Sequence, residues 1–206
     1  MKVVKLIVKL CKKRSETLAL FACFFEGRKV SLPFSNTTWY MTREIEIDGL
    51  LYSLDAEEMV ATVEKCVDKE YTEVNIPDSF FYEGIVYEVT SIGSRAFSGC
   101  SSLTAITIPK GVTYIGGSAF LNSGITYLTI LGKPTIDEQA FDSCKNLTDI
   151  YCYSEDVPHA KGPCYSFGAF GSLDLSRITL HVPENAIEAY KKTEPWCGFG
   201  TIVTIK

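Results

Sequence analysis

One hydrophobic pattern recurs along this chain: a large apolar residue, two spacers, an aliphatic residue, one spacer and a further apolar residue, or L-x-x-I-x-I. Five copies begin at residues 71, 103, 125, 147 and 175 and read YTEVNI, LTAITI, ITYLTI, LTDIYC and LSRITL. Alternate side chains of an extended chain point to opposite faces, so the pattern predicts short strands with one buried side. The intervals of 32, 22, 22 and 28 residues predict a repeat architecture.

A second pattern precedes these strands in the regular units. Isoleucine is followed five residues later by the phenylalanine of an Ala-Phe pair, and a small residue or cysteine comes three residues after that. The segment is too short for a regular helix, so we expect a turn or 3₁₀ piece that closes the opposite side of the unit. The glycines of IGGSAF are expected to supply positive φ in this turn. The phenylalanines are predicted to align inside the stack: Phe97, Phe120, Phe141 and Phe170.

The predicted fold is α+β but mainly β, a right-handed solenoid of about five turns over residues 70–182 with short parallel strands. One unit buries too little apolar surface to fold alone, so both ends need caps. An alternating run at Glu44–Leu54, broken by Asp48-Gly49, predicts an N-terminal hairpin cap. The run Val60–Val67 predicts another strand, and Glu83-Gly84 marks a second hairpin. The segment ENAIEAYKK after Pro183 predicts a helical C-terminal cap, whose apolar residues cover the core: Trp196, Phe199, Ile202 and Ile205.

These patterns divide the chain into two parts. Residues 1–42 form an N-terminal extension, and residues 43–206 form the repeat domain. Within that domain we expect a cap and first strand at 43–88, repeats at 89–182 and a cap at 183–206.

The repeat phrases VTSIGSRAFSGCSSLTAITIPKGV and VTYIGGSAF resemble the BspA-type leucine-rich repeat, a family of secreted and surface proteins of Bacteroidota. The lead-in EIDGLLYSL and the closing segment LHVPENAIEAYKKTEPWCGFGTI are also similar to that family, and the resemblance covers roughly residues 43–206. It implies ligand binding or adhesion at the cell surface without enzyme activity. The first 40 residues have no counterpart in this resemblance.

Charge is unevenly distributed. Residues 1–29 carry eight Lys or Arg and two Glu, a net charge of +6, so the remainder has a net charge of −11. An acidic repeat body argues against a nucleic-acid partner. The basic start and the apolar run Leu18–Phe25, which contains LFAC, leave two interpretations open. One is an export signal or lipoprotein anchor, and the other is an unrelated or mis-started extension. No run has the length of a membrane span.

The cysteines do not form a clear disulfide framework. Cys100 and Cys144 occupy the same position of the repeat and are interpreted as small buried apolar residues. Cys152 and Cys164 flank the insertion SEDVPHAKGP and would bridge in an oxidising compartment, an alternative that the spacing leaves open.

Catalytic and metal-binding patterns are not found. The chain has no C-x-x-C, H-E-x-x-H, G-x-S-x-G or phosphate-binding glycine loop, and neither His159 nor His181 has a ligand at a recurring spacing. We therefore expect no enzyme activity, no metal and no cofactor.

Exposed strand positions are the candidate binding residues. The first exposed position carries a hydroxyl in every unit, which strand propensity explains: Thr72, Thr104, Thr126, Thr148 and Ser176. Propensity explains the next positions less well, because they combine aromatic and charged residues in the C-terminal half. Such residues are typical of interface anchors, and four are predicted to bind ligand: Tyr127, Asp149, Tyr151 and Arg177. The insertion between Cys152 and Ser166 is a second place for ligand contact.

Three classes of function fit these features. The leading one is a secreted or cell-surface module, a monomer that binds or adheres to a host or neighbouring-cell protein. The alternative is a carbohydrate-binding surface in which Tyr127 and Tyr151 stack on sugar rings. A spacer function fits a short chain poorly.

Overall fold

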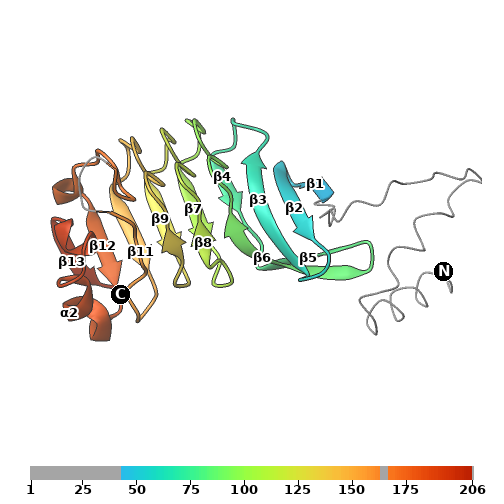
Figure 1. The fold of residues 1–206 in the computed structure, drawn as a ribbon. Coiled ribbons are helices and arrows are strands. Elements are labelled where there is room, and N and C mark those ends of the chain that lie inside the picture. The colour runs from blue at the N-terminus through green and yellow to red at the C-terminus, as the bar shows by residue number, and fades with distance from the viewer. Residues whose placement is uncertain (1–42, 163–166, 206) are drawn as a thin grey trace, which may run out of the picture. The chain divides into compact units, whose positions relative to one another are not determined.

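The computed structural model describes residues 43–162 and 167–205, so the predicted export signal and Cys164 lie outside the described residues. Six strands form a parallel sheet in the order β13-β12-β11-β9-β7-β4 and lie side by side in sequence order (Figure 1). Every pairing between them is parallel. Their bounds are β4 (Glu73–Asn75), β7 (Ala105–Ile108), β9 (Tyr127–Ile130), β11 (Asp149–Cys152), β12 (Thr179–Val182) and β13 (Thr201–Thr204).

The predicted neighbours are therefore confirmed, because the strand of each repeat pairs with that of the next. Ile106 lies opposite Leu128, and Leu128 lies opposite Ile150. The sixth strand, β13, was not predicted: the sequence pattern assigned Ile202 to the end of the core, whereas it pairs with Leu180 of β12.

A second sheet has the order β1-β2-β3-β6-β8-β10, with β5 paired to β6. It begins with the two expected hairpins, β1–β2 and β5–β6, and continues through parallel pairings of β3, β6, β8 and β10. The bounds are β1 (Arg43–Ile47), β2 (Leu50–Asp55), β3 (Val60–Cys66), β5 (Ser79–Tyr82), β6 (Ile85–Ile92), β8 (Tyr114–Ile115) and β10 (Thr135–Ile136). The sequence pattern did not reveal β8 and β10, since two-residue strands are too short to show alternation.

The described helices are short and lie near the C-terminus. They are the 3₁₀ turns η2 (Leu175–Arg177), η3 (Glu184–Ala186) and η4 (Trp196–Gly198), and the helix α2 (Ile187–Tyr190). The predicted helix after Pro183 is confirmed in η3 and α2. Buried Trp196 and Phe199 pack edge-on against Phe170, with ring centroids 5.5 and 5.2 Å away.

The predicted column of phenylalanines is confirmed at the centre of the core. The four rings are buried and stack in series, with centroid separations of 5.0, 5.1 and 5.7 Å and interplanar angles of 2°, 7° and 19°. Each Ala-Phe turn is also joined to the next by its backbone, since Phe97 N donates to Ala119 O and Phe120 N donates to Ala140 O, both at 2.7 Å. The turns are thus held by ring stacking and hydrogen bonds together.

The expectation that glycine supplies positive φ in IGGSAF is wrong. The residue with positive φ in this turn is Ser118, at 57°, and the equivalent residues Arg95 and Gln139 have φ of 62° and 56°. Gly116 is required for a different reason: a Cβ there would lie 2.6 Å from the backbone nitrogen of Ser94. Close approach of neighbouring turns explains that glycine.

The alignment of the final repeat is also corrected. The pattern placed residues 175–180 in a strand with Arg177 beside Asp149, but Leu175–Arg177 form a 3₁₀ turn, and Thr179 is the residue opposite Asp149. The Asp174 side chain accepts from Ser176 N at 3.2 Å and favours the turn. The two residues of extra length are therefore absorbed before the strand begins.

Cys100 and Cys144 are buried as expected. The Cys144 thiol donates to Phe120 O at 3.0 Å, and burial raises its pKa to about 11. Cys152 is a free buried thiol that accepts a hydrogen bond from the Tyr190 hydroxyl at 3.1 Å.

A polar cluster joins the second sheet to the insertion after β11. Lys161 Nζ lies 2.7 Å from Asp137 Oδ1, and the Tyr114 hydroxyl donates to the other carboxylate oxygen. The hydrogen bond from Lys161, and then that from Tyr114, lower the pKa of Asp137 to about 2. The carboxylate thus favours the folded state while it is ionised.

Replacing Phe120 with Ala should lower the free energy of unfolding by about 3–5 kcal/mol, because the change opens a cavity between two stacked rings. Phe81, which is 71% exposed, provides the control: Phe81→Ser should change stability by only about 0.5 kcal/mol. Urea unfolding measures both. Equal, small losses would show that the column does not support the core.

Acid should weaken the Asp137 cluster. Its stabilisation is complete above the ordinary Asp pKa of about 4 and is lost as the pH falls toward about 2, because protonation removes the ion pair. Asp137→Asn should remove this part of the pH dependence, which is below about 1 kcal/mol after solvent screening. Unfolding curves at several pH values test it, with Glu155→Gln as the control. Identical acid profiles for the Asn variant and the wild type would contradict the assignment.

Candidate functional site

The parallel sheet presents two rows of outward side chains. Its inward residues are buried, so the intervening positions face solvent in register across the strands. The first row holds Glu73, Ala105, Tyr127, Asp149, Thr179 and Thr201. The second row holds Asn75, Thr107, Thr129, Tyr151, His181 and Val203.

Aromatic and ionisable side chains of these rows gather on β9, β11 and β12. Tyr127 is 49% exposed and lies directly opposite Asp149. The rings of Tyr151 and His181 stack at a centroid distance of 4.2 Å and an interplanar angle of 9°. His181 Nε2 lies 2.9 Å from Asp149 Oδ1. We call these four residues the aromatic–acidic cluster.

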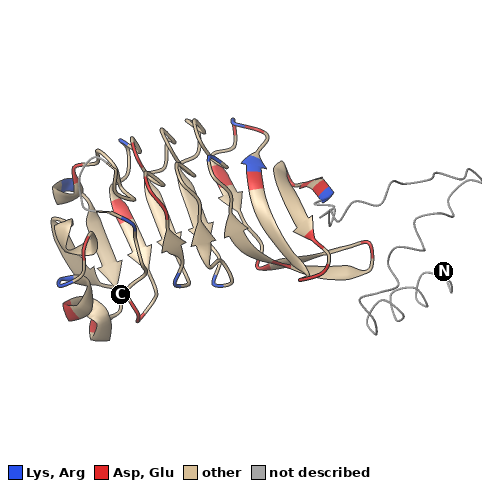
Figure 2. Ribbon diagram, viewed as in Figure 1, with Lys and Arg blue, Asp and Glu red and all other residues tan. Residues whose placement is uncertain are grey.

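The cluster has one part whose side chains hold each other in place and one part that is accessible. His181 stacks on the Tyr151 ring and bonds the Asp149 carboxylate, so these three side chains are fixed together. Tyr127 instead is half exposed to solvent. Strand β9 and its neighbour β7 contain no charged residue and are drawn without red or blue in Figure 2. The arrangement can bind a ligand by ring stacking and by hydrogen bonds to Asp149.

Three of the four predicted site residues, Tyr127, Asp149 and Tyr151, are brought together. Arg177 is not on the strand rows, because it belongs to η2. His181 was missed because the final repeat was aligned two residues too early. The alternation Leu180-His181-Val182, with both flanking residues buried, carries the signal that would have found it.

The threonine column connects successive units. The Thr104 hydroxyl donates to Thr72 O at 3.0 Å, and the Thr148 hydroxyl donates to Thr126 O at 3.4 Å. Their backbone N–H groups bond the same carbonyls. Ser176 departs from the column and bonds Asp174. These contacts support the structural interpretation of the column.

The insertion after β11 is only partly described, since residues 163–166 lie outside the described ranges. Its described part is attached to the core: Trp196 Nε1 donates to Pro158 O at 2.8 Å, and Ile136 N donates to His159 O at 2.8 Å. The role of the insertion in ligand contact stays a prediction.

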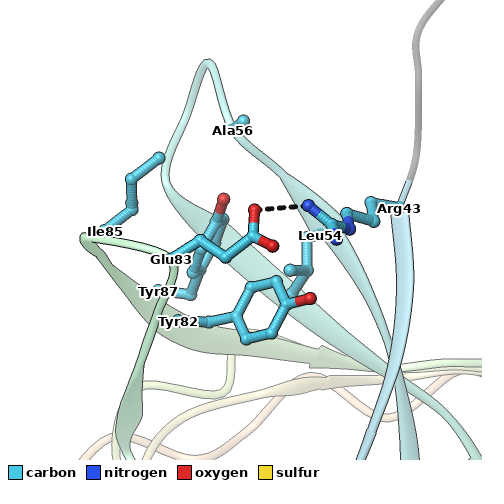
Figure 3. A pocket seen from close by; sticks show the side chains of 7 residues that line it. All are labelled: Arg43, Leu54, Ala56, Tyr82, Glu83, Ile85 and Tyr87. Carbon is cyan, nitrogen blue, oxygen red and sulfur yellow. Dashed lines mark hydrogen bonds and ion pairs between the residues drawn. The ribbon is translucent and has the colours of Figure 1, made fainter. Parts of the chain in front are cut away.

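A pocket of about 580 Å³ lies between the two N-terminal hairpins (Figure 3). Arg43 forms an ion pair with Glu83, and its guanidinium lies 5.1 Å from the centroid of the Tyr82 ring. The hydrogen bond to Glu83 raises the pKa of Arg43, and burial raises that of Tyr87. The remaining lining is apolar: Leu54, Ala56 and Ile85. Because Arg43 and Glu83 neutralise each other, the pocket attracts a charged ligand only weakly.

Residues 43–162 and 167–205 lack two further features. Within these ranges, His, Cys, Asp and Glu side chains nowhere gather in a group of three or more that would hold a metal ion. The same part of the chain contains no helix with the length and apolar character needed to cross a bilayer.

The model of the BspA type leucine rich repeat region matches residues 70–190 with six copies. Among solved structures, the chain is similar to a leucine rich cell surface protein from Faecalibacterium prausnitzii, with 24% identity and a TM-score of 0.50 over 79% of this chain and 43% of that chain. It therefore spans less than half of that protein. A leucine-rich repeat protein from Bacteroides capillosus has 20% identity and a TM-score of 0.44, over 79% and 99% of the two chains. No curated protein matches the chain significantly.

His181 should hold the Tyr151 ring. His181→Ala should remove the stack, shift the ring-proton resonances of Tyr151 and cost about 0.5–1.5 kcal/mol. His181→Phe is the matched control, because it keeps an aromatic face but loses the bond to Asp149. NMR spectra of the two variants test the assignment. Unchanged Tyr151 resonances in the Ala variant would contradict it.

Proposed function

The chain belongs to the BspA-type leucine-rich repeat family, whose model covers more than half of it, and we propose that it is a non-catalytic module that binds a protein ligand. The observation that supports this function is the aromatic–acidic cluster on a sheet face otherwise built mainly of small or uncharged residues. Tyrosine, histidine and a carboxylate in contact resemble the anchors of protein interfaces, where a few residues supply most of the affinity.

The fold suits this role because it presents a broad, rigid surface. We propose a right-handed solenoid in which β4, β7, β9, β11, β12 and β13 form one wall. Residues 43–88 supply the cap and first strand at one end, and residues 183–206 close the other. Parallel pairing of successive repeats and the Phe column support this proposal. Such a wall places rows of side chains at fixed spacing, which reduces the entropy lost on binding.

The proposed location is the cell surface or the outside of the cell, where the module acts in adhesion as a monomer. Support comes from the family and from the similar F. prausnitzii protein, which is described as a leucine rich cell surface protein. The partner is then an extracellular or host protein.

A carbohydrate ligand is the second candidate, favoured by one observation. Half-exposed Tyr127 lies opposite Asp149, with the hydroxyl-bearing Thr129 two residues further along β9 and Thr179 on the other side of Asp149, on β12. Sugars bind proteins through CH groups on aromatic faces and hydroxyls on polar side chains. Parallel screening on an extracellular-protein array and a glycan array separates the two classes.

For a ligand that such a screen finds, Tyr127→Ser/Tyr151→Ser should weaken binding at least about tenfold, or about 1.4 kcal/mol, because the ring contacts are lost. The unfolding midpoint should fall only modestly, because Tyr127 is half exposed and loss of the Tyr151–His181 stack costs about 0.5–1.5 kcal/mol. Tyr114→Ser, at an exposed tyrosine of the second sheet, is the control. Affinity that is the same in the double variant and the wild type would remove this face from consideration.

A further inference from the structure

The second sheet contains the antiparallel pairs β1–β2, β2–β3 and β5–β6, which we call its antiparallel end. The outward face of this end combines acidic and exposed apolar side chains. In β1, β2, β3, β5 and β6, alternate residues point into the core, and the others face outward. The outward row Asp55, Val60, Glu88 and Ser79 is continuous across four paired strands. Glu44 and Glu46 extend the same face on β1, opposite Ser53 and Leu51.

An exposed apolar pair lies on this face. Phe81 of β5 and Val86 of β6 are directly opposite each other in register and are 71% and 55% exposed. Their neighbours on the inner side behave differently, because Phe80 packs against Tyr52 and Tyr87 with ring centroids 4.9 and 6.0 Å away. The hairpin is thus apolar on both sides, and only the inner side is covered.

Backbone groups are also available here. Within the described residues, β5 pairs with β6 alone, so its other edge has no strand partner. An unpaired edge can accept an extended segment of another chain through main-chain hydrogen bonds.

Charge identifies the kind of partner. Residues 43–92 contain 13 Asp or Glu and three Lys or Arg, a net charge of −10, whereas residues 93–206 contain ten and nine, a net charge of −1. Two of the three basic residues are engaged, Arg43 with Glu83 and Lys69 with Ser98 O. In Figure 2, red recurs on β1, on β3 and along the β5–β6 hairpin. The field at this end therefore attracts cations and repels nucleic acids and anionic membranes.

We propose that this outer face docks a basic, extended segment of a partner protein. An apolar side chain of the segment packs on Phe81 and Val86, and its lysines or arginines pair with Glu44, Glu46 and Glu88. The segment meets the free edge of β5 at one end and crosses the outward face of β6, β3 and β2 toward β1, because Glu44 and Glu46 lie on the strand at the opposite edge of the sheet. This surface shares no strand with the aromatic–acidic cluster, so it is a second binding site that does not depend on the proposed function.

The test measures binding of a short synthetic peptide, in which lysine alternates with valine, to the full chain by fluorescence anisotropy. A glutamate–valine peptide is the probe of opposite charge. The lysine peptide should bind, and the glutamate peptide should not. Raising the salt from about 0.1 M to about 1 M shortens the screening distance from about 10 Å to about 3 Å and should weaken binding markedly.

Two variants separate the apolar and charged contributions. Phe81→Ser/Val86→Ser and Glu44→Gln/Glu46→Gln/Glu88→Gln should each weaken peptide binding at least about tenfold. The charge-matched control, Glu155→Gln/Glu184→Gln/Glu194→Gln, removes three exposed carboxylates elsewhere and should stay within about twofold of the wild type. Unfolding midpoints confirm that the variants are folded, which is expected because the changed side chains are exposed.

Three results would overturn the proposal: wild-type affinity in the Phe81/Val86 variant, an equal loss in the charge-matched control, or equal binding of the glutamate peptide. The second would show attraction by net charge without a specific face. Tyr127→Ser/Tyr151→Ser should leave peptide binding unchanged, so failure here and failure of the proposed function are distinguishable.

Discussion

The rest of the structure depends on the match between two spacings, that of stacked phenylalanine rings and that of paired parallel strands. Neighbouring strands lie about 4.8 Å apart, and the first two ring pairs are separated by 5.0 and 5.1 Å. One translation therefore satisfies the ring contacts, the backbone bonds of the Ala-Phe turns and the strand pairing together. Where the repeat lengthens, between Phe141 and Phe170, the separation grows to 5.7 Å and the rings tilt by 19°. The residues added in this longer repeat lie in loops, because the spacing of the rings and strands leaves no room for them in the stack.

Much of this arrangement follows from the sequence. The register of β4, β7, β9 and β11, the buried column and both hairpins are visible as apolar spacing and turn dipeptides. The final repeat was misaligned because Leu175 is apolar and buried, as the pattern requires, but reaches the core from a 3₁₀ turn. Apolar spacing reports that a residue is buried and does not report which backbone conformation brings it there. That ambiguity placed Arg177 in the candidate site and left out His181.

The backbone conformation of the Ala-Phe turns also could not be predicted from the sequence. Ser118, Arg95 and Gln139 adopt positive φ although glycine would do so at lower cost. The neighbouring unit compensates, since Arg95 N donates to Gly117 O and Ser118 N donates to Glu138 O. These bonds join residues twenty or more positions apart and cannot be read from local sequence. Meanwhile Gly116, where glycine is present, is needed for the close contact with Ser94.

The alternation that builds the fold also explains how one small domain can carry two different surfaces. Inward residues are fixed by the packed core, whereas most outward side chains lie outside that core and are free to differ from strand to strand. On the parallel sheet these positions are mostly small and uncharged around one aromatic–acidic cluster. On the antiparallel end they are acidic around Phe81 and Val86. The two surfaces use different strands and different chemistry, so a ligand on one leaves the residues of the other accessible. We infer that the affinity of a ligand at one face does not depend on whether the other face is occupied, because no strand carries residues of both.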